Sequence, residues 1–313
     1  MRLLQYGVPC SRRPFSSCSS APSARALDTA GFSTAMSPHF ELYHQSPFAP
    51  AGLTLELERI HNRLRMDLSM FAPWMAKERV KILVYSGRKA YASGELRPPS
   101  WSNGIALYDQ RVVATYEQPP KGKLFEVLGH ELSHLFFESY WGETRRKPPV
   151  WLNEGLAMLE ETDPKDAQDS DWYRAMGIFA DGGALKLESF FRVNPSEDLK
   201  TSEAVSRWYA QAYSVVYFLY RRHSRQQFFN FCGQLRNGKD LRESLWLVYR
   251  YPSVDKLQTA WMDWLRLPGT RPQGSLRAPS ASVVQPASTR GAALKATGFR
   301  GFGFRSLLPD EKK

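Results

Sequence analysis

The chain has 313 residues, of which 42% are hydrophobic and 13% aromatic, enough for one substantial folded domain with flanking segments. Its formal net charge of +11 belongs mainly to its ends, because residues 1–38 and 266–313 hold 13 of the 42 basic side chains but only 3 of the 31 acidic ones. A basic nucleic-acid groove is therefore not expected in the domain between them. Three cysteines make no disulfide framework, and no apolar run of about 18 residues predicts a membrane span.

Residues 1–38 are predicted to be a disordered leader. They are rich in Ser, Ala, Pro and Arg and poor in acids, a composition that resembles an organelle transit peptide. The apolar pair Leu3-Leu4 is too short for the core of a secretory signal. A second interpretation is that Met36 is the true start, which predicts a cytoplasmic protein rather than an organelle-targeted one.

The first half of the domain at 39–265 is predicted to form a small sheet. Residues 40–44 alternate between apolar and polar side chains, and 80–85 form an apolar run, so both are expected to be strands. An amphipathic helix is expected over 53–71. The segments 104–109 and 111–116 are separated by a short turn and are predicted to form a hairpin.

Most of the domain after Leu124 is predicted to be helical. A small mixed sheet followed by a helical lobe is an α+β arrangement. The basic tail at 266–313 is rich in Pro, Gly, Ser, Thr and Arg and is expected to be disordered and solvated. The expected helices cover approximately 124–140, 149–161, 203–222, 225–235, 239–248 and 252–265.

The run His130-Glu131-Leu132-Ser133-His134 predicts a zinc site. Two histidines at positions i and i+4 of a helix project from one face, where both imidazoles can reach one ion. Glu131 lies one step round the helix, beside the ion but not bound to it, where a general base for water belongs. The run lies in a helix with apolar residues at spacings of three and four, so its His and Glu side chains are expected to be buried, which favours a metal site over incidental surface residues.

Glu154 is the candidate third ligand. Catalytic zinc has three protein ligands and an open fourth position. A metzincin site would need Gly at 137 and His at 140, where this chain has Phe137 and Tyr140. Glu154 instead falls in a helix that begins near Pro149, and the short connection allows this helix to fold back against the first.

These phrases resemble the gluzincins, zinc peptidases with two histidines and a glutamate, and most closely their peptidase MA-like members. The residues that carry the resemblance are His130 to His134, Trp151-Leu152-Asn153-Glu154-Gly155-Leu156-Ala157 and the tyrosine-rich helix that begins near Trp208. The resemblance covers roughly residues 39–265 and implies a zincin-like fold with the active-site helix between sheet and lobe. It also implies one Zn²⁺ per chain, bound by His130, His134 and Glu154, and a peptide or protein substrate.

The resemblance also implies a role for Tyr209, which takes the place of the tyrosine that stabilises the oxyanion. Tyr213, one turn later on the same face, is the substitute candidate, and core packing is the alternative for both. Two features of the family are missing here. No Gly-Ala-Met-Glu-Asn phrase precedes His130, which favours internal cleavage over action at a free amino terminus, and Met158 stands where thermolysin-type enzymes have a supporting Asp.

The expected reaction is the hydrolysis of peptide bonds by zinc-activated water, with Glu131 as general base and then as proton donor to the leaving amine. Strand 111–116 is the candidate edge strand for pairing with an extended substrate, unless it is simply covered. A non-catalytic zinc-stabilised binding domain and a zinc hydrolase of a non-peptide amide or ester remain as alternatives. The other histidines are expected to be ordinary surface or core residues, and the alternative for His223 is that it reaches the cleft. These histidines are His39, His44, His61 and His223.

Overall fold

The computed structural model describes residues 29–45, 52–99, 102–162, 168 and 170–267. The predictions for the first 28 residues and for the tail after residue 267 lie outside this range. None of the helices in the described range has the length and apolar composition that a membrane span requires.

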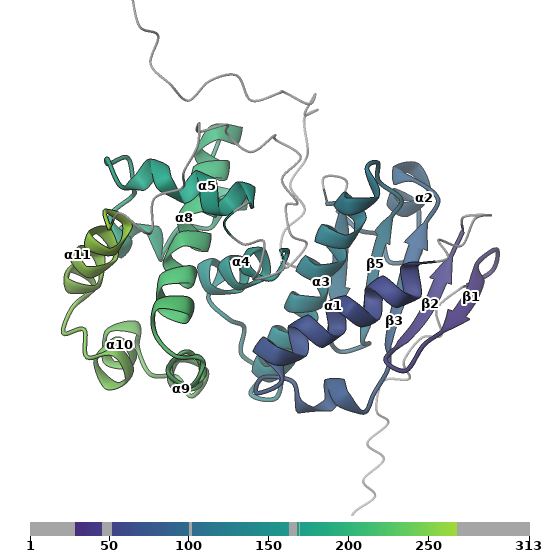
Figure 1. Ribbon diagram of the computed structural model, residues 1–313, viewed down its shortest axis with the longest axis horizontal. Coiled ribbons are helices and arrows are strands. Elements are labelled where there is room, and N and C mark those ends of the chain that lie inside the picture. The colour runs from purple at the N-terminus through teal and green to yellow at the C-terminus, as the bar shows by residue number, and fades with distance from the viewer. Residues whose placement is uncertain (1–28, 46–51, 100–101, 163–167, 169, 268–313) are drawn as a thin grey trace, which may run out of the picture.

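The first half of the domain forms a five-stranded mixed sheet (Figure 1). Its spatial order is β1-β2-β3-β5-β4, with parallel pairing at its centre and an antiparallel strand at each edge. The strands are β1 (Ser33–Met36), β2 (Phe40–His44), β3 (Val80–Tyr85), β4 (Gly104–Leu107) and β5 (Val112–Tyr116).

Two predictions about this sheet need correction. Strand β1 lies inside the segment 1–38 that was expected to be a leader, and it pairs antiparallel with β2, so the sheet begins before residue 39. Strand 111–116 is not an edge strand, because β5 pairs with β3 on one side and with β4 on the other. All five residues of β5 are buried, which suits an inner strand, and β4 takes the edge instead.

Both faces of the sheet are covered, because side chains that alternate along β3 belong to two different buried clusters. Ile82 and Val84 belong to the main core, together with residues of α1 (Leu53–Leu68) and α3 (Lys121–Gly142). Leu83 and Tyr85 point the other way, into a smaller cluster with Tyr91 of α2 (Arg88–Ala92). Helix α3 is therefore fixed against β4 and β5 on one side and against α1 on the other.

The rest of the described chain is a helical lobe in which α4 lies between α3 and α8 (Figure 1). Helix α8 continues into a π-helical turn, Phe218–Arg222, within a segment expected to be one regular helix. The short helices α5 to α7 were not predicted. The helices of the lobe are α4 (Val150–Leu159), α5 (Asp171–Met176), α6 (Leu187–Phe190), α7 (Pro195–Asp198), α8 (Ser202–Tyr217), α9 (Arg225–Arg236), α10 (Leu241–Tyr249) and α11 (Val254–Leu265), with short 3₁₀ turns at Pro73–Ala76 and Gly177–Phe179.

Gly155 sets the distance between α4 and α8. A Cβ atom at this position would lie 2.5 Å from the carbonyl oxygen of Ala212 and 2.5 Å from Cγ2 of Val216. The two backbones can approach this closely only because residue 155 has no side chain. Since Glu154 precedes Gly155, the same contact fixes the helix that carries the candidate ligand.

Gly155→Ala is expected to destabilise the fold by about 1–3 kcal/mol, because the overpacked contact with α8 outweighs the better helix propensity of alanine. The free energy of unfolding from urea denaturation measures this effect. Gly122→Ala is the matched control, since Gly122 lies in the first turn of α3 with nothing within 4 Å of its added Cβ. An equal and small effect of both substitutions would contradict the packing argument.

Candidate functional site

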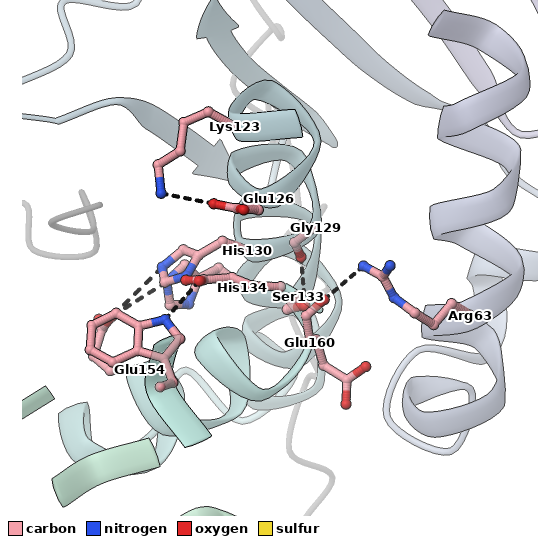
Figure 2. A network of polar contacts seen from close by, with 11 residues as sticks. Arg63, Lys123, Glu126, Gly129, His130, Ser133, His134, Glu154 and Glu160 are labelled. Carbon is pink, nitrogen blue, oxygen red and sulfur yellow. Dashed lines mark hydrogen bonds and ion pairs between the residues drawn. The ribbon is translucent and has the colours of Figure 1, made fainter. Parts of the chain in front are cut away.

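The two histidines of α3 face each other in the protein interior. His130 and His134 lie one turn apart, are 0% and 2% exposed, and have their Nε2 atoms 3.0 Å apart. Figure 2 shows both imidazoles directed from α3 toward Glu154. The apolar spacing that predicted a buried helix over 124–140 corresponds to the observed α3, which extends from 121 to 142.

Glu154 comes from α4 and completes the group. Its Oε2 lies 3.9 Å from Nε2 of His130 and 3.6 Å from Nε2 of His134, and the side chain is 1% exposed. Three ligands placed tetrahedrally about 2.0–2.1 Å from one zinc ion would lie about 3.4 Å from one another. The spacing, the burial and the two-imidazole, one-carboxylate donor set therefore fit a zinc ion.

His130 is oriented by a residue that the sequence analysis did not identify. Oε1 of Glu161 lies 2.7 Å from Nδ1 of His130, while its Oε2 accepts a hydrogen bond from Nε1 of Trp172 at 2.8 Å. A carboxylate that accepts from Nδ1 leaves Nε2 available as a ligand. Glu161 lies just beyond the end of α4, seven residues after Glu154, and this spacing alone does not distinguish it from a solvated residue.

The asparagine of the Trp-Leu-Asn-Glu phrase influences His134. Burial and the neighbouring His130 place the pKa of His134 well below its ordinary value, and Asn153 opposes this shift. Nδ2 of Asn153 donates to Oε1 of Glu138 at 2.8 Å. Burial raises the pKa of Glu138 to about 7, opposed by Asn153 and Lys147.

Glu131 lies next to Gly104, the first residue of the edge strand β4. The side chain is 1% exposed, and its Oε1 has no hydrogen-bond partner among the described residues. Burial raises the pKa of Glu131 to about 7, against the opposing influence of His130. A Cβ atom on Gly104 would lie 2.6 Å from Cγ and 2.7 Å from Oε1 of Glu131, so only glycine fits at this point of β4.

The two candidate tyrosines occupy different surroundings. Both are buried in α8, and burial raises the pKa of each well above its ordinary range. The charge of Glu154 adds to this effect at Tyr209. Tyr213 instead interacts with Ser170 through a hydrogen bond and with Tyr217.

His223 is not part of this group. Its Nε2 lies 3.2 Å from the hydroxyl of Tyr251, and its ring packs against Phe218 and Tyr249.

A buried charge network holds the end of α4. Arg63 of α1 donates from Nη2 to the carbonyl oxygen of Glu160 at 2.8 Å, directly before Glu161 (Figure 2). Arg221, in the π-helical turn, lies 2.7 Å from Oδ2 of Asp67 and 3.5 Å from Oε1 of Glu160. Glu160 is 0% exposed, and burial, with the charge of Asp67, raises its pKa to about 8.

This network predicts a pH-dependent stability. A carboxyl whose folded-state pKa is raised contributes stability below its unfolded pKa of about 4.5 and loses it as the pH rises through about 8. Glu160→Gln should therefore gain stability relative to the unmodified protein between pH 5 and pH 8, by at most about 1.4 kcal/mol per pH unit. Urea unfolding at pH 5, 7 and 8 measures the difference, and Glu203→Gln, at an exposed position in the first turn of α8, is the control. A difference that stays constant with pH would contradict the buried-carboxyl explanation.

Comparison with known proteins places this site in a family. The family model described as the peptidase MA superfamily matches residues 67–267, well over half of the chain, and this range includes His130, Glu131, His134, Glu154 and Tyr209. No curated protein matches the chain significantly. The extent of the family match shows that the chain belongs to the peptidase MA superfamily.

Proposed function

We propose that this chain is a zinc-dependent endopeptidase with one zinc ion held by His130, His134 and Glu154. The observation that carries the proposal is the meeting of these three buried donors at 3.0–3.9 Å, with the carboxylate of Glu131 next to them in the sequence of α3. Membership of the peptidase MA superfamily supports a metallopeptidase-type function, for which peptides or proteins are the substrates.

When bound, zinc supplies Lewis acidity, which lowers the pKa of a water molecule to about 7 and polarises a carbonyl group. Glu131 takes the proton of the attacking water on its carboxylate and then transfers it to the leaving amine nitrogen. Its burial suits both steps, because a pKa raised to about 7 lets the group accept and release a proton near neutral pH. Tyr209 donates its hydroxyl hydrogen to the developing oxyanion.

The edge strand β4 is the proposed support for an extended substrate. Among the strands of the described residues it pairs with β5 alone, it lies against α3, and it begins at Gly104, next to Glu131. A peptide that adds to the free edge of β4 would extend the sheet through backbone hydrogen bonds and pass beside the general base. The proposal keeps the expected zincin-like arrangement and gives β4 the role first assigned to 111–116. The lack of an amino-terminal capture phrase favours internal cleavage.

The first experiment measures cleavage of a mixed peptide library by zinc-loaded protein, with and without a chelator. Glu131→Gln is expected to retain zinc and to lose hydrolysis by about 10²- to 10⁴-fold, because it keeps the shape of the side chain without its basicity. His130→Ala is expected to lose both zinc and activity. Mass spectrometry of the products shows whether cleavage is internal.

Three outcomes would count against the proposal. Near-normal activity of Glu131→Gln would remove Glu131 from the general-base role. Absence of peptide cleavage in every zinc-loaded sample would favour a zinc-stabilised binding domain. Hydrolysis confined to non-peptide amides or esters would place the substrate in another class.

The two tyrosines can be separated by paired substitutions. Tyr209→Phe is expected to lower kcat by about 10²- to 10³-fold with little change in KM, as for the loss of one oxyanion donor. Tyr213→Phe is its matched control on the same helix and is expected to keep near-normal kcat. Thermal unfolding of both variants checks that the fold is kept, and a larger loss for Tyr213→Phe would reverse the assignment.

A further inference from the structure

A second group of metal-ligand side chains lies at the junction of β2 and α1. Glu58 and His61 occupy positions i and i+3 of α1, and His39 directly precedes β2. Potential ligand atoms of the three residues lie within 4.8 Å of one another. A Glu-x-x-His pair on one helix face is a recurring element of metal sites. All three residues precede residue 67, so they lie outside the family match and outside the candidate catalytic group.

His61 has an unsatisfied nitrogen in the protein interior. Its Nε2 lies 2.9 Å from the carbonyl oxygen of Met75, and because a carbonyl only accepts, this nitrogen carries the hydrogen. In a neutral imidazole the other nitrogen, Nδ1, then presents a lone pair. The side chain is 1% exposed, and Nδ1 has no hydrogen-bond partner among the described residues. A histidine that donates one N–H to a backbone carbonyl is oriented as metal-bound histidines usually are.

Glu58 is held in a comparable way. Its Oε1 accepts hydrogen bonds from Oγ of Ser37 at 2.7 Å and from the backbone N–H of His39 at 3.0 Å. Its Oε2 lies 2.7 Å from Nδ1 of His39. These contacts fix the carboxylate of Glu58 beside the two imidazoles.

We propose that His39, Glu58 and His61 form a second zinc site, separate from the catalytic group. The rings of His39 and His61 are stacked, with centroids 3.8 Å apart and planes inclined by 14°. An ion binds in the plane of each imidazole, so His39 must tilt out of the stack when zinc enters. His39 is the ring free to do so, since its side chain is 22% exposed whereas His61 is fixed to Met75. This rearrangement makes the second site weaker than the preformed group on α3 and α4.

The test counts zinc bound by the full chain after chelator treatment and reloading, by isothermal titration and elemental analysis. The unmodified protein is expected to bind two equivalents, and His134→Ala to keep the weaker one. Adding Glu58→Gln to His134→Ala should lower this remaining affinity at least about tenfold. Glu56→Gln in the same background is the matched control, because Glu56 lies on the same helix and pairs with Arg59 instead.

His39→Ala gives a second variant at a partly exposed position, with His223→Ala as its control. Cobalt serves as a spectroscopic probe, and its visible absorption bands should report nitrogen ligands in the His134→Ala protein and lose intensity in the His39→Ala, His134→Ala double variant. Loss of all bound zinc in the His134→Ala protein, or unchanged zinc affinity on adding Glu58→Gln and His39→Ala to His134→Ala, would overturn the proposal. Neither result depends on peptidase activity, so a failure here is distinct from a failure of the proposed function.

Discussion

The burial of one carboxylate against two imidazoles is the constraint on which the rest of this structure depends. His130, His134 and Glu154 are nearly inaccessible to solvent, and their potential ligand atoms lie 3.0–3.9 Å from one another. Taking such groups out of water costs several kcal/mol per ion unless opposite charge compensates. A bound cation would meet this requirement at the segment of α3 from His130 to His134, whose polar side chains are buried.

The surrounding elements hold α3 and α4 at the separation that brings His130, His134 and Glu154 together. Helix α3 is fixed by β4, β5 and α1, while α4 packs against α8 through the missing side chain of Gly155. The end of α4 is held from two sides, by Arg63 at the carbonyl of Glu160 and by Arg221 at its carboxyl group. Glu161 follows Glu160 immediately and contacts His130. The position of the His130 imidazole is therefore linked to the contacts of Arg63 and Arg221 with Glu160.

Much of this arrangement is predictable from the sequence, because the signals are local. The spacing of apolar residues predicted α3 and α4 within a few residues of their observed ends, and the α+β arrangement and the family assignment are confirmed. The predictions that were wrong concern strand pairing, which depends on distant parts of the chain. The sequence of a single strand does not determine which strands lie beside it, so β5 was wrongly predicted to lie at the edge of the sheet. Strand β1 has the composition of a leader, and only its pairing with β2 reveals it.

Glu161 illustrates a different limit. A carboxylate two turns after a ligand is as compatible with solvent as with a buried histidine, and only the meeting of α4 with α3 decides between them. The same holds for Asn153, whose contacts with Glu138 and His134 exist only in the folded chain.

The π-helical turn at the end of α8 has a consequence for how this sequence can change. A π turn holds one residue more than an α turn, and a residue added to or removed from a helix rotates everything beyond it by about 100°. Arg221 lies in that turn and meets Asp67 and Glu160 only in the present register. A relative that lacked the extra residue would leave two buried acids without their arginine. Loss of the insertion and replacement of those acids are therefore expected to occur together in the descent of the family.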